Sequence, residues 1–220
     1  MRTTEGQGAL VGRNRSAPAP GATPPVLESR RMRYAALVFA TIGLVLAVSV
    51  SAIAQDDLVA ALRTPGHIGL MRHSTAPGSD DPPNFKLGEC STQRNLSAGG
   101  RAQAQAVGAR LRQAGLTGVR VVSSQWCRTL DTARLLGIGT VEELPALNSL
   151  VSYPGQSTTM TADARRWILS QDPSKPTILV THQINIGALV NAYPNEGDIV
   201  VVQRTATGEL RVLGTIPADR

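Results

Sequence analysis

The chain has 220 residues, with 22 Lys and Arg against 16 Asp and Glu, and a formal net charge of +6. Residues 1–54 hold six of the basic residues and two of the acidic ones, so residues 55–220 carry a net charge of only +2. The basicity of the whole chain therefore indicates no nucleic-acid partner. The remaining segment is long enough for one domain with a proper core and too short for two. Aromatic residues are 3% of the chain, so this core is predicted to be aliphatic.

The first 54 residues are predicted to lie outside the folded domain. Residues 1–31 are rich in Gly, Pro, Ala, Ser and Thr, which indicates a disordered extension or a mis-set translation start. Residues 32–54 have the marks of a signal peptide, because arginines precede an apolar run that ends in Ala52-Ile53-Ala54. Residues 55–220 are therefore predicted to be a periplasmic or secreted domain. The alternative is a retained inner-membrane anchor, since the whole apolar run approaches the length that spans a bilayer.

The rest of the chain alternates between strand and helix patterns. In chain order we predict a helix over 57–62, a strand over 67–71, a loop over 74–95, a helix from Ser97 to Gly115, a strand over 119–123, a helix over 125–136, a strand over 141–144, a helix over 161–170, a strand over 177–181, a helix over 184–190, and a hairpin of residues 198–203 and 209–216. This order predicts an α/β fold: a three-layer sandwich whose mostly parallel central sheet is flanked by helices, with an antiparallel edge.

The chain has two cysteines, Cys90 and Cys127, and both lie in the segment predicted to be exported. Such a pair indicates a disulfide in an oxidising compartment, whereas two free thiols would be expected in the cytosol. A bridge would join two loops, because Cys90 lies just before Arg94 and Cys127 directly precedes Arg128. A zinc site is disfavoured, since there is no C-x-x-C motif and the three histidines lie far apart.

Chemically competent side chains follow the three strongest strand predictions. His73, Ser124 and His182 lie at or just beyond the carboxyl ends of these strands, where ligands bind in such sheets. Arg128 follows Ser124 in an S-x-x-x-R-T-x-x-T-A pattern, in the first turn of a helix whose unpaired N–H groups favour an anion. With Arg72, these residues place two histidines and two arginines at one edge. They predict a cationic pocket that suits a phosphoryl group and contains a nucleophile able to accept it.

These motifs resemble those of the histidine phosphatase superfamily, which has the phosphoglycerate-mutase-like fold. The resemblance spans residues 66–216, and its motifs occur in the family's order: Leu70-Met71-Arg72-His73, Arg94-Asn95-Leu96-Ser97, Ser124 to Ala133, and Val180-Thr181-His182. It implies that His73 is phosphorylated during turnover and that Arg72, Arg128 and His182 surround the transferred phosphoryl group. Ser74, Arg94 and Gln183 are predicted to contact the substrate. Neither a metal ion nor another cofactor is expected.

The resemblance is incomplete at the proton donor. Mutase-like members carry a glutamate after the R-x-x-x-T-A helix, where this chain has Leu147-Asn148-Ser149. Members of the acid phosphatase branch have an aspartate after the last histidine, where this chain has Gln183. Five carboxylates stay open as the general acid: Asp80, Asp81, Glu89, Glu142 and Glu143. A leaving group of low pKa would need no donor.

Residues and resemblance together predict an exported, metal-independent phosphatase that hydrolyses phosphomonoesters through a phosphohistidine on His73. The small size, the signal peptide and the first loop are similar to bacterial members proposed to act on envelope sugar phosphates. The predicted partner is therefore a sugar phosphate or another phosphorylated small molecule, with membrane contact only through the N-terminal signal or anchor. The alternative is a noncatalytic phospho-ligand binder or sensor of the envelope. A phosphomutase is disfavoured, because the glutamate is absent and a glycolytic substrate would not be met outside the cytosol.

Overall fold

The computed structural model describes residues 55–219. The predicted extension over 1–31 and the signal peptide or anchor over 32–54 lie outside these residues. Residues 55–61 are helical, in agreement with the first predicted helix. Within the described part of the chain, no helix combines the length and apolarity needed to cross a membrane.

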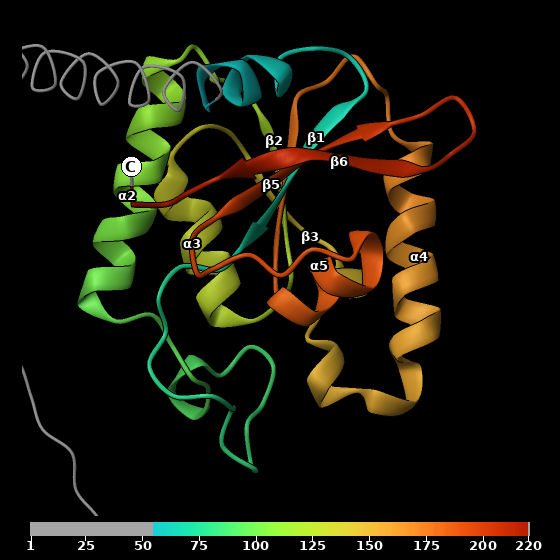
Figure 1. The fold of residues 1–220 in the computed structure, drawn as a ribbon. Helices are drawn as coiled ribbons and strands as arrows, with labels where there is room; N and C mark the ends of the chain where they lie inside the picture. The colour runs from blue at the N-terminus through green and yellow to red at the C-terminus, as the bar shows by residue number, and fades with distance from the viewer. Residues whose placement is uncertain (1–54, 220) are drawn as a thin grey trace, which may run out of the picture. The chain divides into compact units, whose positions relative to one another are not determined.

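A six-stranded sheet forms the centre of the domain (Figure 1). In spatial order its strands are β3 (Val141–Glu143), β2 (Arg120–Ser123), β4 (Thr177–Thr181), β1 (His67–Arg72), β5 (Ile199–Arg204) and β6 (Leu210–Ile216). The first four run parallel, whereas β5 pairs antiparallel with β1 and β6 antiparallel with β5. The predicted α/β sheet with an antiparallel edge is confirmed.

Helices cover both faces of the sheet. Figure 1 shows α2 (Ala98–Gln113) and α3 (Cys127–Leu136) on one side, and α4 (Ser157–Ser170) and α5 (Gln183–Val190) on the other. Successive residues of a strand point to opposite faces. Met71 of β1 therefore belongs to the core that contains Leu111 of α2, and Leu70 to the core that contains Ile168 of α4. Both cores are almost wholly aliphatic, and together with the sheet they make the predicted three-layer sandwich.

Two helices begin at different residues from those predicted. The predicted start of α3 at residue 125 is wrong, because Trp126 has an extended backbone (φ −69°, ψ 138°) and the helix begins at Cys127. The predicted start of α4 at Thr161 is also wrong, since the helix begins at Ser157. The Ser and Thr residues of its first turn have low intrinsic helix propensity, and packing of the apolar face of α4 against the sheet outweighs that local preference. By contrast, Ser97 caps α2 as predicted, with its Oγ accepting from the Gly100 backbone N–H at 2.9 Å.

The sheet brings the ends of three strands to one edge. β1, β4 and β2 are neighbours in parallel register, and the chain leaves them at His73, His182 and Ser124. Residues 74–95 form the predicted loop, in which only Cys90–Thr92 makes a short 3-10 helix among the described residues. This loop lies beside the same edge, at the bottom of Figure 1.

Candidate active site

Most of the predicted site residues meet in one pocket of about 310 Å³. Its lining includes Arg72, His73, Arg94, Arg128, His182 and Gln183. Ser74, predicted to contact the substrate, does not line this pocket. It is fully buried, and its backbone N–H donates to Thr132 Oγ1 at 3.0 Å. Ser74 thus holds the end of β1 against α3.

His73 is buried in a defined tautomer. Its Nδ1 lies 2.8 Å from the Ser74 carbonyl oxygen, which can only accept, so Nδ1 carries the proton and Nε2 carries the lone pair. Burial lowers the pKa of His73 to about 3, and the positive charges of Arg128, Arg94 and Arg72 act in the same direction. At neutral pH the ring is therefore uncharged and nucleophilic at Nε2, from which Arg94 Nη2 lies 3.5 Å away.

His182 is the second buried imidazole. Its Nε2 lies 3.0 Å from the Ser124 hydroxyl, which donates its own proton to Asn148 Oδ1 at 3.3 Å. The hydroxyl then accepts from Nε2–H, which leaves the Nδ1 lone pair free. Burial lowers the pKa of His182 well below its usual value, with further contributions from Arg128 and His73. The centroids of the two imidazole rings lie 5.7 Å apart in an edge-to-face arrangement.

Arg128 is held by a buried carboxylate. Its Nη1 donates to both carboxylate oxygens of Asp81, at 2.8 and 3.1 Å, and the two side chains are only 4% and 7% exposed. Asp81 also accepts from the Arg94 backbone N–H at 2.9 Å and from Trp126 Nε1 at 2.8 Å. Burial alone would raise the pKa of Asp81, but these hydrogen bonds outweigh it and the net pKa lies below the usual range. Asp81 is therefore a fixed anion rather than a proton donor at neutral pH.

Glu196 is a pocket neighbour that the sequence analysis missed. Its Oε1 lies 3.5 Å from Arg72 Nη2 and 3.9 Å from Arg94 Nη1. The residue stands in the connection between α5 and β5, within a Pro-Asn-Glu-Gly stretch whose pattern indicates only a turn. No sequence motif around Glu196 predicts its place at the pocket, because its partners Arg72 and Arg94 come from the end of β1 and from the first loop.

The other candidate acids separate into two groups. Three do not line the pocket and bind other side chains: Glu89 pairs with Lys86, Glu142 with Arg120, and Glu143 with Gln125. Asp80 lines the pocket, with Oδ2 accepting from Ser79 Oγ at 2.7 Å. Asn148, in the place where mutase-like members have a glutamate, is 5% exposed and bound to Ser124 and Gln125. Of the five candidates, only Asp80 combines a place in the pocket with freedom from Arg128.

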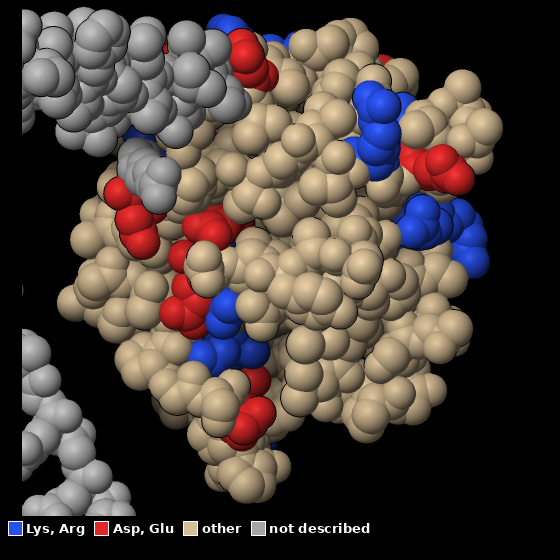
Figure 2. All heavy atoms as spheres, in the orientation of Figure 1, with Lys and Arg blue, Asp and Glu red and all other residues tan. Residues whose placement is uncertain are grey.

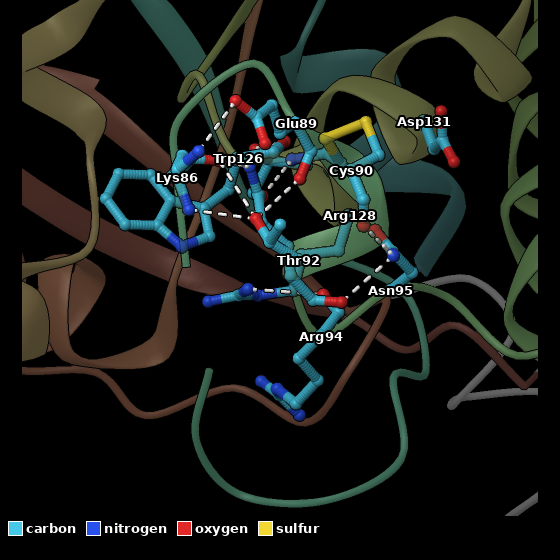
Figure 3. Close-up of a disulfide and its surroundings, with 12 residues drawn as sticks. Lys86, Glu89, Cys90, Thr92, Arg94, Asn95, Trp126, Arg128 and Asp131 are labelled. Carbon is cyan, nitrogen blue, oxygen red and sulfur yellow. Dashed lines mark hydrogen bonds and ion pairs between the residues drawn. A yellow bond between two sulfur atoms is a disulfide. The ribbon is translucent and has the colours of Figure 1, made fainter. Parts of the chain in front are cut away.

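A disulfide joins Cys90 to Cys127, with an S–S distance of 2.04 Å (Figure 3). It ties the first loop to the first residue of α3, and Figure 3 shows Arg94 and Arg128 on the two segments that it connects. A hydrogen bond from Cys127 N–H to Gln93 Oε1 at 3.0 Å supports the same junction. The bridge thus restrains the loop that carries Arg94 and the helix start that carries Arg128.

Across residues 55–219, no group of three or more His, Cys, Asp or Glu side chains is placed to hold a metal ion. The chemistry available in the pocket is that of neutral imidazoles, guanidinium groups and carboxylates.

The fold and this arrangement define an α/β protein of the phosphoglycerate-mutase-like class, in which buried histidines and arginines meet at the carboxyl edge of the sheet. Residues 68–151 match the histidine phosphatase superfamily (branch 1).

Solved structures share this fold at low sequence identity. The structure of open reading frame Rv3214 from Mycobacterium tuberculosis is similar at 19% identity and a TM-score of 0.54, over 69% of this chain and 97% of that chain. A candidate alpha-ribazole-5'-P phosphatase from Escherichia coli is similar at 20% identity and a TM-score of 0.50, over 70% of this chain and 98% of that chain. No curated protein sequence matches the chain.

The disulfide should contribute strongly to stability. It closes a loop over a sequence separation of 37 residues, for which the chain-entropy relation gives about 4 kcal/mol. We expect the double variant Cys90→Ser/Cys127→Ser to lose about this much free energy of unfolding in urea titrations. A reducing agent should destabilise the wild type by a similar amount and leave the double variant unchanged. A reductant that affects both proteins equally would contradict this assignment.

Removal of the buried Asp81 charge should be costly. Asp81→Asn leaves the Arg128 guanidinium buried without its counter-charge, and breaking a buried pair in this way costs about 3–5 kcal/mol. Urea unfolding should show this loss. The matched control is Asp163→Asn, whose partner Arg166 is 75% exposed, and which should lose less than about 1 kcal/mol. Equal losses of unfolding free energy for the two substitutions would show that the Asp81–Arg128 pair contributes no more than an exposed ion pair.

The domain should lose stability in mild acid. Because the pKa of His73 is about 3 in the folded state and 6.5 is its ordinary value, the unfolded chain binds a proton between these pH values and the folded chain does not. Stability therefore falls as pH decreases through 6.5, by about 2 kcal/mol per such histidine between pH 7.5 and 5. His73→Gln should gain that amount relative to wild type over this range, measured by urea unfolding. If the free energy of unfolding of wild type and of His73→Gln changed equally with pH, His73 could not be neutral and buried in the folded state.

Proposed function

We propose that this protein is an exported phosphatase that hydrolyses phosphomonoesters through a phosphohistidine intermediate on His73, without a metal ion. The observation that carries this proposal is the hydrogen bond from His73 Nδ1 to the Ser74 carbonyl oxygen, which leaves a neutral Nε2 facing the arginines of the pocket. A neutral imidazole in a cationic site is a competent acceptor for a phosphoryl group.

In the first step the lone pair of His73 Nε2 forms a bond to phosphorus. The bond from phosphorus to the ester oxygen breaks, and the alkoxide leaves with that electron pair and takes a proton from water. The phosphorylated ring still carries its Nδ1 proton and is formally cationic, and the Ser74 carbonyl that accepts from Nδ1 stabilises this charge.

In the second step a water oxygen forms a bond to phosphorus and the phosphorus–nitrogen bond breaks. Its electron pair returns to Nε2, the water loses a proton, and inorganic phosphate is released. Phosphoryl transfer depends mainly on positioning and on neutralisation of the oxygen charges, for which Arg72, Arg94 and Arg128 provide the donors. His182, which burial keeps neutral, lines the same pocket and adds a further polar contact.

Export is supported by two independent features. Residues 32–54 have the pattern of a signal peptide, and the Cys90–Cys127 disulfide is of the kind that persists in oxidising compartments. We therefore propose a periplasmic or secreted protein, with an inner-membrane anchored form as the alternative. The proposed substrates are phosphorylated small molecules, with sugar phosphates of the cell envelope as the leading class.

A noncatalytic phospho-ligand binder is the second candidate. The observation in its favour is that Asp81 is bound to Arg128 and Asn148 replaces a glutamate, so the pocket has few groups able to supply a proton. A phosphomutase is disfavoured for the same reason.

Hydrolysis of p-nitrophenyl phosphate separates these functions, since its good leaving group needs no protonation. The wild-type chain should turn over this ester in the presence of EDTA, and His73→Ala should lower kcat at least about 1000-fold, because it removes the nucleophile. His67→Gln is the matched control, since His67 opens β1 and its ring bonds only to nearby backbone carbonyls. It should retain full activity.

Other results would change the proposal. Inhibition of the wild type by EDTA would contradict a metal-independent reaction. Tight binding of inorganic phosphate, measured by calorimetry, without turnover of the ester would favour the binder. Equal activity of His73→Ala and wild type would exclude His73 as the nucleophile.

A further inference from the structure

The positively charged side chains of the pocket are concentrated around His73. Among the described residues that line the pocket, only Arg72, Arg94 and Arg128 are positively charged, and all three lower the pKa of His73 through their charge. Their side chains are 20%, 11% and 4% exposed. The positive charge therefore surrounds the nucleophile and does not extend to the pocket mouth.

This positive charge is also largely balanced. Asp81 pairs with Arg128, and Glu196 lies within 4 Å of Arg72 and Arg94. At the lower left of Figure 2, basic and acidic side chains lie next to one another over the loop between β1 and α2. Three guanidinium groups with two carboxylates leave about one net positive charge, which suits one phosphoryl group and no further anion.

Asp80 is the one charged group among the exposed residues of the pocket lining. These exposed residues are Ser79, Asp80, Pro82, Pro83, Val151 and Ile184. Val151 and Ile184 are 60% and 46% exposed, so they form open surface against which the alcohol part of a substrate can pack. Asp80 is exposed and lines the same pocket. A second anionic group on the substrate would meet Asp80 and find no cation.

Neither Lys86 nor Gln183 adds positive charge to the pocket for a second anionic group of the substrate. Lys86 is bound to Glu89 and does not line the pocket. Gln183, which does line it, has its Nε2 committed to the Pro194 carbonyl oxygen at 3.0 Å. The described residues thus offer a carboxylate or second phosphate of the substrate no charged partner.

We infer that the pocket selects phosphomonoesters whose alcohol part is uncharged, and that Asp80 is the residue that rejects a second anion. The inference rests on the proposed function, because it concerns the alcohol that this reaction releases. Neutral polyols, sugars and aryl or alkyl alcohols fit the pocket, whereas phosphorylated carboxylic acids and bisphosphates are rejected. Specificity of this kind comes from a repulsive element as much as from an attractive one.

Binding of two nonhydrolysable phosphonates tests the inference independently of turnover. The probes are phenylphosphonate and 3-carboxyphenylphosphonate, which differ by one carboxylate, and Kd is measured by calorimetry with the full chain at low salt. The wild type should bind the carboxylated probe about tenfold more weakly, as expected for one like-charge contact at the pocket mouth. The difference should decrease at high salt, because the charges are exposed to solvent.

Two variants identify the residue responsible. Asp80→Asn should bring the two Kd values to within about twofold to threefold of each other, and Val151→Lys should reverse the preference by supplying a cation. Glu89→Gln removes a carboxylate of the same loop that lies outside the pocket, and it should keep the wild-type ratio.

Three results would overturn the inference: equal binding of both probes by wild type, an unchanged ratio in Asp80→Asn, or no binding of phenylphosphonate. Hydrolysis of p-nitrophenyl phosphate reports on the proposed function separately. Discrimination between the phosphonates by a protein that does not hydrolyse this ester would uphold the charge selectivity and refute the phosphatase.

Discussion

The buried pair of Arg128 and Asp81 is the interaction on which the rest of the site depends. It joins the first turn of α3 to the loop after β1, and the same carboxylate also binds the backbone of Arg94 and the indole of Trp126. Desolvation makes a buried pair costly unless its hydrogen bonds are well formed, and here Asp81 accepts from three different residues. Because Asp81 occupies only Nη1, the buried Nε of Arg128 has no partner within the described residues. The pair therefore fixes the guanidinium while part of it stays available to an anion.

Burial has two opposite consequences for the histidines. It keeps His73 and His182 neutral, which leaves the lone pair of His73 Nε2 unprotonated at physiological pH. The same burial makes the folded domain sensitive to acid, since the unfolded chain gains protons that the folded chain cannot bind. The disulfide and the hydrogen bond between Cys127 and Gln93 offset part of this instability by restraining the loops around the pocket. Such restraint also preorganises the arginines, so that little reorganisation is needed when a phosphoryl group binds.

The pocket is less cationic than its motifs suggest. The sequence pattern emphasises arginines, because Arg72 and Arg128 stand in recognisable motifs, whereas Asp81 and Glu196 stand in loops without a pattern. With those carboxylates in place the site has a charge suited to one phosphoryl group. The remaining loop anion, Asp80, then becomes a means of selecting substrates rather than one of several equivalent acids. The apolar residues near it, including Val151 and Ile184, favour the uncharged part of a substrate.

The strands, the order of the helices and the positions of His73, Arg128 and His182 at the edge of the sheet could all be predicted from the sequence. These features follow from local patterns, because a short apolar run ends at a definite residue and parallel strands end at a common edge. The sequence could not predict the first turn of α4, whose Ser and Thr residues are helical only through packing, or the partners of the arginines. Asp81 meets Arg128 across 47 residues, and Glu196 reaches Arg72 from the far end of the chain. These contacts depend on the path of each loop, which is set by long-range packing and hydrogen bonds that leave no periodic pattern in the sequence.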